Sequence, residues 1–226
     1  MSEDLPPPDP ARIRGTLPED ADLLELAAGT RLVRVHSQGG PHPLRWNELR
    51  YWGPTNSRFD HHTPPPGTQH RAIAYLAHGD SAFPTALGEY FQDGTGAGVG
   101  PIDTRNQVTV TVFDSAADLV LLDLASGWTT RAGGNQAICS GPRRRSREWA
   151  RAIYDAHGST GGSGSPLIVG LAYPSSVWGP GRCVAVWESA RHVLTGATLR
   201  ETRLLSDPAM APAVETAALA LGTYVV

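Results

Sequence analysis

The chain has 226 residues with a formal net charge of -3 at pH 7, and 40% of its residues are hydrophobic and 18% charged. This is the composition of an ordinary globular protein that can bury a sizeable core, and so small a net charge gives no sign of bulk nucleic-acid binding. No apolar run approaches the roughly 20 residues that cross a bilayer, and the acidic, proline-rich residues 1–10 are unlike a signal peptide, so we expect a cytoplasmic protein without a membrane anchor.

The cysteine and lysine contents limit the chemistry. Cys139 and Cys183 are too few for a disulfide framework and have no metal-type spacing, so we expect two reduced, buried thiols. All 19 basic residues are arginines. Because lysine is absent, anion binding must fall to arginine, backbone amides or hydroxyls, and a lysine nucleophile is excluded.

The N-terminal part predicts an arm, a helix and a strand. Residues 1–20 are rich in proline and acidic residues, which favours an extended arm that either lies on the domain or is disordered. Residues 22–28 are expected to form a short helix. Residues 30–35 alternate in polarity and predict a strand, from which Arg34 points either into a cleft or into solvent.

A long loop is expected over residues 39–67, which contain many prolines and glycines. Its aromatic residues and Arg58 argue that it packs on the domain. His61, His62 and His70 lie in or beside this loop without a nearby cysteine or paired carboxylate, so they do not favour a metal site. We expect no metal.

The stretch from residue 72 to residue 91 predicts a strand followed by a helix. Residues 72–77 form a short apolar run typical of a buried strand. Ser81 can cap the helix that follows and Pro84 suits its first turn. Residues with core spacing on this helix are Leu87, Tyr90 and Phe91. Tyr75 on the strand and Glu89 on the helix are therefore expected side by side.

The second half of the chain alternates strands with loops. We expect a glycine-rich loop at 94–100, strands at 107–113 and 119–124, and a loop at 126–141. Residues 143–157 predict a helix whose inner face carries Trp149, Ala150, Ile153 and Tyr154. Four arginines at its start are interpreted as a solvated face, because the chain is not basic and has no DNA-binding motif.

The remaining elements complete an α+β pattern. We expect a turn at 158–165, strands at 167–172 and 183–187, and a tail with one or two strands and a helix near 213–221. Strands outnumber helices, and there is no regular alternation of strand and helix. This favours an α+β domain built on mixed or antiparallel sheets.

Several short motifs occur in an order that resembles the RES domain, the toxin half of a bacterial toxin–antitoxin class. They are LVRV at 32–35, RFD at 58–60, AYLA at 74–77, TALGE at 85–89, and GLAYPS at 170–175 followed by CVAVW at 183–187. The resemblance divides the chain into an N-terminal extension (1–28), a RES domain (29–192) and a C-terminal segment packed on the same domain (193–226). It implies an ADP-ribosyltransferase-like fold, with a split mixed β-sheet core, flanking helices and a cleft for NAD.

The resemblance also implies an activity and a site. Members of the family degrade NAD by splitting the nicotinamide–ribose bond, and some transfer ADP-ribose to phosphate or to a protein. The family's catalytic residues fall on Glu89, Arg34 and Tyr75. Its NAD-binding residues fall on Arg34, Arg58, Tyr75 and Ser175, although Ser176 is adjacent and could take the serine's place.

These residue types suit that chemistry. Nicotinamide leaves as a neutral molecule, so the barrier lies in the oxocarbenium-like ribosyl cation, which a carboxylate such as Glu89 can stabilise. Arginine forks suit a pyrophosphate, Tyr75 can stack on nicotinamide, and Ser175 can donate to ribose or phosphate. Taken singly, each residue also has an ordinary structural interpretation.

Several alternatives stay open at this point. The chain could be an NAD glycohydrolase, an NAD phosphorylase, a protein ADP-ribosyltransferase, or a non-catalytic module that binds NAD or a partner. A helix-turn-helix antitoxin is the partner that the resemblance implies. The acceptor or protein target and the oligomeric state, a homo-oligomer included, are not determined by the sequence.

Overall fold

The computed structural model describes residues 4–93, 98–158 and 168–226. Its strands are β1 (Leu23–Leu26), β2 (Arg31–Ser37), β3 (Arg50–Gly53), β4 (Gly67–His78), β5 (Val108–Asp114), β6 (Leu119–Asp123), β7 (Gly170–Pro174), β8 (Arg182–Trp187) and β9 (Thr198–Leu204). Its α-helices are α1 (Pro10–Gly15), α2 (Ala82–Tyr90), α3 (Trp128–Arg131), α4 (Ala137–Ser140), α5 (Arg143–Ile153), α6 (Arg191–Thr195) and α7 (Ala211–Ala220). None of the helices in these ranges is both long and apolar enough to span a membrane.

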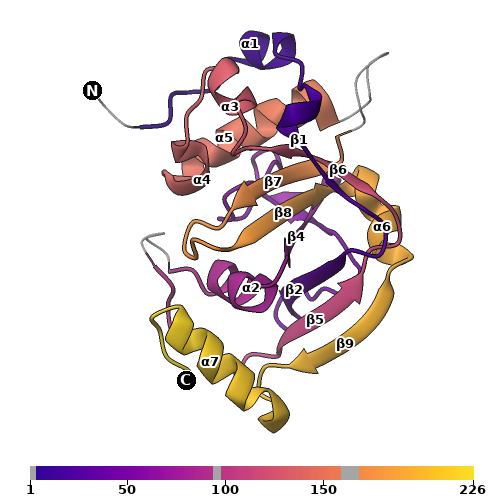
Figure 1. The fold of residues 1–226 in the computed structure, drawn as a ribbon, viewed down its shortest axis with the longest axis vertical. Helices are drawn as coiled ribbons and strands as arrows, with labels where there is room; N and C mark the ends of the chain where they lie inside the picture. The colour runs from indigo at the N-terminus through magenta and orange to yellow at the C-terminus, as the bar shows by residue number, and fades with distance from the viewer. Residues whose placement is uncertain (1–3, 94–97, 159–167) are drawn as a thin grey trace.

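The strands form one strongly curled sheet (Figure 1). Their order is β1-β6-β7-β8-β4-β2-β5-β9, and β3 pairs with β4 outside this path. Neighbours are antiparallel except β6 and β7, which run parallel. The prediction of an α+β domain on a mixed sheet with flanking helices is therefore confirmed.

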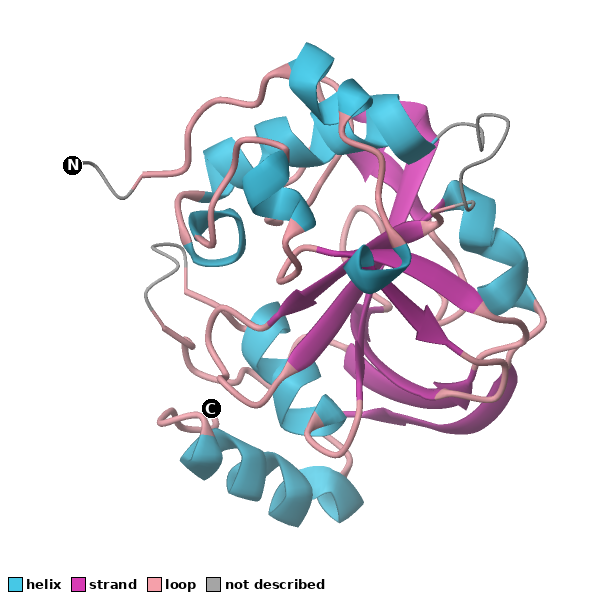
Figure 2. Cartoon of the chain, turned by 45° about the horizontal axis from the view of Figure 1, so that its top comes forward, coloured by secondary structure: helices cyan, strands magenta, loops and turns pink. Residues whose placement is uncertain are grey.

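The sheet splits between β2 and β4, at its centre. These two strands share only the pairs Leu32 with His78 and Val33 with Ala77. Beyond Val33, β2 continues along β5 as far as Ser37, whereas β4 continues along β8. Figure 2 shows that the strands fan out and do not lie in one flat layer. The two halves of the sheet diverge from one short contact, as expected for a split sheet.

Helices cover the two halves separately (Figure 1). Helices α1, α3, α4 and α5 lie together above β6 and β7, where Ile13, Trp128, Trp149 and Ile153 are fully buried. Helix α2 lies against β2 and β4 and buries Leu87 beside Val33 and Ala77. Helix α7 packs on α2 in turn. Helix α2 thus sits beside the split and holds its residues close to it.

The helix predicted at residues 22–28 is wrong. Residues 23–26 are strand β1, which pairs with β6. A run as short as Leu-Leu-Glu-Leu fits both the helical and the strand pattern of apolar residues. Its pairing with the apolar strand β6 determines that it is a strand. The described part of the predicted arm, residues 4–20, lies on the domain, where Trp149 Nε1 donates to the Pro6 carbonyl at 2.8 Å. It contains helix α1.

Other boundaries also differ from the predictions. The expected loop at 126–141 contains α3 and α4, and the loop at 39–67 contains β3. The helix predicted to reach residue 157 ends at Ile153 and continues as a π turn to Gly158. Tyr90 is 40% exposed and is not a core residue. The turn predicted at 158–165 lies almost wholly outside the described residues, as does part of the loop at 94–100.

The ends of the chain take part in the same sheet. Strand β1 comes from the predicted extension and pairs with β6, and β9 comes from the predicted C-terminal segment and pairs with β5. The division at residues 28 and 192 stays a prediction. Cys139 and Cys183 are free and buried, as expected.

Candidate functional site

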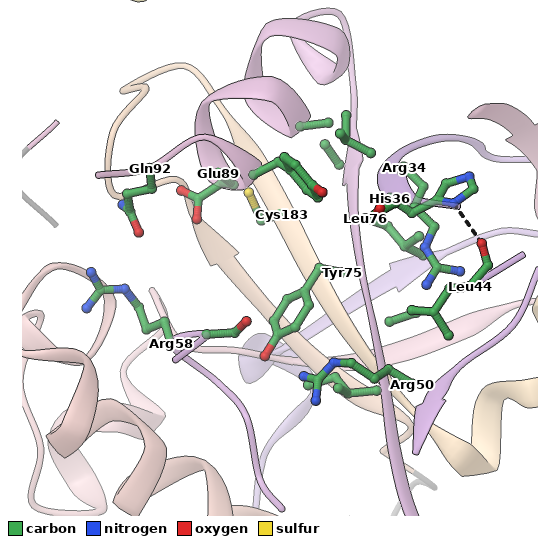
Figure 3. Close-up of a pocket in the computed structure, with 18 of the residues that line it drawn as sticks. Arg34, His36, Leu44, Arg50, Arg58, Tyr75, Leu76, Glu89, Gln92 and Cys183 are labelled. Atoms are coloured by element: carbon green, nitrogen blue, oxygen red, sulfur yellow. Dashed lines mark hydrogen bonds between the residues drawn. The ribbon is translucent and has the colours of Figure 1, made fainter. Parts of the chain in front are cut away.

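A cavity of about 430 Å³ opens where the sheet splits (Figure 3). Residues 34–37 of β2 line one wall and residues 73–77 of β4 line another. Apart from Ala77, which pairs with Val33, these residues belong to the stretches in which the two strands no longer pair with each other. Glu89 of α2 and Arg58 of the long loop close it at one end, away from Arg34. The split of the sheet therefore creates the cavity.

Glu89 is held at the cavity by one of its two oxygens. Its Oε1 accepts from Ser175 Oγ at 2.7 Å, from the Ser176 amide at 3.0 Å and from Ser176 Oγ at 3.4 Å. Among the described residues, none donates to Oε2. The carboxylate is therefore oriented by the protein through one oxygen, and the other oxygen is available to a ligand.

A close approach of the turn between β7 and β8 brings Ser175 to Glu89. The turn closes with bonds from the Ser175 amide to the Gly181 carbonyl and from the Gly181 amide to the Trp178 carbonyl, at 3.0 and 2.8 Å. A Cβ at Gly181 would lie 2.7 Å from Thr85 Oγ1 of α2 and 2.9 Å from Ser175 Cβ. Only glycine leaves room for this contact between turn and helix.

Arg34 is buried, with 3% of its surface exposed, and both faces of β2 are covered. Its Nη1 donates to the carbonyls of Trp46 and Glu48 at 2.7 and 2.6 Å, and more weakly to Arg45. Burial lowers the pKa of Arg34 to about 10. In the described part of the chain no acceptor meets its Nε or Nη2. The side chain therefore braces the loop and also lines the cavity, so the solvated alternative is excluded.

Arg58 comes from the loop that the sequence predicted to pack on the domain. Its Nη1 donates to the Gly141 carbonyl and, at 3.4 Å, to Ser146 Oγ. Its Nε is buried without a hydrogen-bond partner in the described residues. Burial lowers the pKa of Arg58, while the charge of Glu89 opposes that shift. Arg58 and Glu89 therefore face a common space and interact through it.

Tyr75 stands between the two ends of the cavity, with Arg58 and Glu89 on one side and Arg34 and Arg50 on the other (Figure 3). Its hydroxyl is buried and forms no well-aligned hydrogen bond with a described residue, although the Ser57 side chain lies close enough to interact with it. Burial raises the pKa of Tyr75 far above its ordinary value, so the hydroxyl is neutral at physiological pH. An aromatic face and a free hydroxyl are thus offered to a ligand.

Sequence reasoning missed several polar residues of this cavity, and four of them matter for its chemistry. They are His36, Arg50, Gln92 and Arg143. Arg50 forms a buried ion pair with Asp60 at 2.9 Å. The alternation of β2 could have indicated His36, since it lies two residues after Arg34 on the same face. No local pattern marks the other three.

Unpartnered buried polar atoms indicate what the cavity can hold. Arg58 Nε, Arg143 Nε and the Tyr75 hydroxyl are buried and line it without a partner among the described residues. Buried donors are almost always satisfied, so these atoms are suited to acceptors on a ligand. Together with Arg34, they favour an anionic ligand with many oxygens.

The histidine-rich loop makes different contacts. His62 Nδ1 lies 2.6 Å from Asp60 Oδ1, and His61 is packed against Tyr154. Within residues 4–93, 98–158 and 168–226, no three His, Cys, Asp or Glu side chains are grouped so that they could hold a metal ion. His61 and His62 are buried side chains of the core, and neither lines the cavity.

No family model matches the chain, and no curated protein matches its sequence. Among solved structures it is similar to a chain in the crystal structure of the M. tuberculosis MbcT–MbcA toxin–antitoxin complex, with a TM-score of 0.53 and 16% identity over 90% of this chain and 94% of that chain. At this identity the likeness establishes a shared fold: the protein has the fold of a component of a toxin–antitoxin complex.

Proposed function

We propose that the chain is a toxin that degrades NAD by splitting the bond between nicotinamide and ribose. The observation that carries the proposal is the convergence of Arg34, Arg58, Tyr75 and Glu89, which are far apart in sequence, on one cavity, with Ser175 bonded to Glu89. A shared fold with a component of a toxin–antitoxin complex supports the toxin role.

The bond-breaking step would depend on Glu89. Positive charge develops on the ribose as neutral nicotinamide departs, so a carboxylate stabilises the transition state more than the ground state. Oε1 is occupied by Ser175 and Ser176, which leaves Oε2 to approach the ribose or accept from its hydroxyl groups. Because the carboxylate is already oriented, little reorganisation accompanies the reaction.

Substrate binding would use the remaining groups. A dinucleotide carries a pyrophosphate, which suits the free nitrogens of Arg34 and Arg58. The ring of Tyr75 can stack on the nicotinamide and hold it for departure. A cavity of about 430 Å³ is within the usual range for ligand sites.

The acceptor of the ADP-ribosyl group distinguishes three forms of the activity. Water gives ADP-ribose, inorganic phosphate gives ADP-ribose 1″-phosphate, and a protein acceptor gives a modified protein. In each case the nicotinamide–ribose bond breaks, the electron pair of that bond leaves with nicotinamide, and the acceptor oxygen or nitrogen bonds to the ribose carbon and loses its proton. The products therefore report the acceptor directly.

An antitoxin is the partner proposed for this chain. The similar chain belongs to a toxin–antitoxin complex, and the resemblance to the RES domain suggests an antitoxin with a helix-turn-helix domain. Such a partner would block the cavity. Co-purification from the native cells, followed by a test of whether the partner stops NAD loss, examines this part of the proposal.

The test of function is nicotinamide release from NAD by the purified protein. Glu89→Gln keeps the size of the side chain and removes its charge, so release should fall by about 100-fold or more. Glu215→Gln, on the exposed face of α7, is the matched control and should behave as the wild type. Adding phosphate, or a cell extract with labelled NAD, separates the three acceptors.

Two outcomes would overturn the proposal. NAD that binds without turnover would identify a non-catalytic module. Equal nicotinamide release by the wild type and Glu89→Gln would remove the catalytic role of the carboxylate.

A further inference from the structure

A chain of hydrogen bonds runs from Arg143 to Glu89. Arg143 Nη2 donates to Gln92 Oε1, and Gln92 Nε2 donates to Ser176 Oγ at 2.6 Å. Ser176 in turn donates to Glu89 Oε1 through its amide at 3.0 Å and its hydroxyl at 3.4 Å. Gln92 and Arg143 both line the cavity, and Gln92 lies beside Glu89 in Figure 3.

The arginine determines the direction of every bond in this chain. An arginine can only donate, so the amide oxygen of Gln92 must face Arg143 and its nitrogen must face Ser176. Because Ser176 Oγ accepts that amide proton, its own proton is free to point at Glu89. Glu89 therefore receives donors only, which suits an ionised carboxylate. Linked bonds of this kind strengthen one another.

The position of Arg143 also indicates a role outside its own helix. It is the first residue of α5, where the helix dipole disfavours a cation. Its neighbours Arg144 and Arg145 pair with Glu148 of the same helix. Arg143 instead reaches Gln92 and the Asp93 carbonyl, the latter at 3.2 Å. The contact ties the start of α5 to the segment that follows α2.

We propose that Gln92 and Arg143 are positioning residues that hold the Glu89 carboxylate in one rotamer, so that Oε2 meets the reacting sugar. This inference rests on the proposed function, since it assigns the two residues to the same reaction. They act through Ser176 and Glu89. Their loss therefore lowers kcat and leaves substrate binding almost unchanged.

The experiment compares Gln92→Glu, Gln92→Ala and Arg143→Leu with the matched control Arg144→Leu. Gln92→Glu keeps the contact with Arg143, but a carboxylate cannot donate to Ser176. It also adds a negative charge near Glu89, and two neighbouring carboxylates disfavour each other's charged form. In Gln92→Ala and Arg143→Leu, kcat for nicotinamide release should fall about tenfold with KM within about twofold of the wild type, as expected for the loss of one to two hydrogen bonds.

A pH profile separates positioning from a merely structural role. In Gln92→Glu the acidic limb of kcat should move to higher pH, whereas Arg144→Leu should keep the wild-type kcat and profile. Wild-type kcat and an unchanged profile in Gln92→Glu would overturn the inference. So would an equal loss of kcat in Arg144→Leu.

Crystal structures provide a readout that does not depend on activity. In Gln92→Ala we expect Glu89 in more than one rotamer and the contact between Ser176 Oγ and Glu89 lost. A single wild-type rotamer would overturn the positioning role even if the protein has no activity on NAD. If the wild type releases no nicotinamide but Glu89 is disordered in Gln92→Ala, the proposed function is wrong, whereas Gln92 still orients Glu89.

Discussion

The contact between the β7–β8 turn and helix α2 can be tested at a single glycine. Gly181 faces Thr85 and Ser175 so closely that a Cβ there would lie 2.7 Å from Thr85 Oγ1 and 2.9 Å from Ser175 Cβ. Thr85 is fully buried and bonds to the Ser81 carbonyl at 2.6 Å, so it cannot swing aside. In Gly181→Ala, the turn must therefore move away from α2.

The expected size of the effect follows from this geometry. Overpacking of a tight contact costs about 1–3 kcal/mol, which corresponds to a drop in Tm of about 2–12 °C for a chain of this length. The displacement acts on Ser175, whose hydroxyl lies 2.7 Å from Glu89 Oε1. A shift of a few tenths of an ångström weakens this bond, and we expect kcat for nicotinamide release to fall about tenfold, as for one hydrogen bond lost.

A second glycine in the same turn provides the control. Gly179 has no atom within 4 Å of the position of a Cβ, and neither glycine has a positive φ. Gly179→Ala should therefore keep full activity and gain up to about 1 kcal/mol, because alanine restricts the unfolded chain. Calorimetry and nicotinamide release are measured on both variants. If the two behave alike, the close approach does not position Ser175 and the reasoning fails.

Two further predictions concern buried groups of the cavity. Burial, together with the charge of Arg34, lowers the pKa of His36 to about 4 from its ordinary 6.5. Between pH 6.5 and pH 4, His36 therefore binds a proton in the unfolded chain but stays neutral in the folded protein, and stability falls as the pH falls. Wild type should lose up to about 3 kcal/mol more stability than His36→Gln over that range, measured by urea unfolding, and parallel losses would contradict the assignment. Tyr75→Phe removes a buried hydroxyl that has no described partner, so stability should stay equal or rise by about 1 kcal/mol while NAD affinity falls. A loss of stability with unchanged affinity would indicate a structural hydroxyl.

The sequence predicts best where its pattern is repeated over several residues. Strands β5, β6 and β8 agree with the prediction, because an alternating pattern or a continuous apolar run of this length is typical of a strand. The four residues of β1 were assigned to a helix, because so short a run carries no period and its pairing with β6 is a tertiary event. The helices α3 and α4 have four residues each and lie below the length at which periodicity can be read.

The site was predicted only in part, for a related reason. Arg34, Arg58, Tyr75 and Glu89 were placed by the resemblance of their motifs, and the structure brings all four to one cavity. Arg143 was interpreted as part of a solvated face. Helical periodicity predicts which face of a helix a residue occupies. Arg143 is the first residue of α5, and its side chain reaches a residue outside the helix, which periodicity does not predict. Its partner, Gln92, is 51 residues away in sequence, and no pattern connects them.

The split of the sheet gives Arg34 two roles that mutagenesis must separate. Beyond Val33, one edge of β2 has no partner strand in the described part of the chain. The segment at residues 44–48 covers that edge: its carbonyls accept from Arg34, and the Leu44 amide donates to the Ser37 carbonyl at 3.1 Å. Removing the guanidinium leaves the partly buried carbonyls of Trp46 and Glu48 without this donor, which costs at most about 1–3 kcal/mol for each. A loss of activity in an Arg34 variant would therefore reflect the loss of these loop contacts as much as the loss of the proposed contact with the pyrophosphate. Tyr75 forms no such bracing hydrogen bonds with the described residues, and Glu89→Gln keeps an amide oxygen that can still accept from Ser175 and Ser176. The assignment of the reaction therefore depends on Tyr75→Phe and Glu89→Gln.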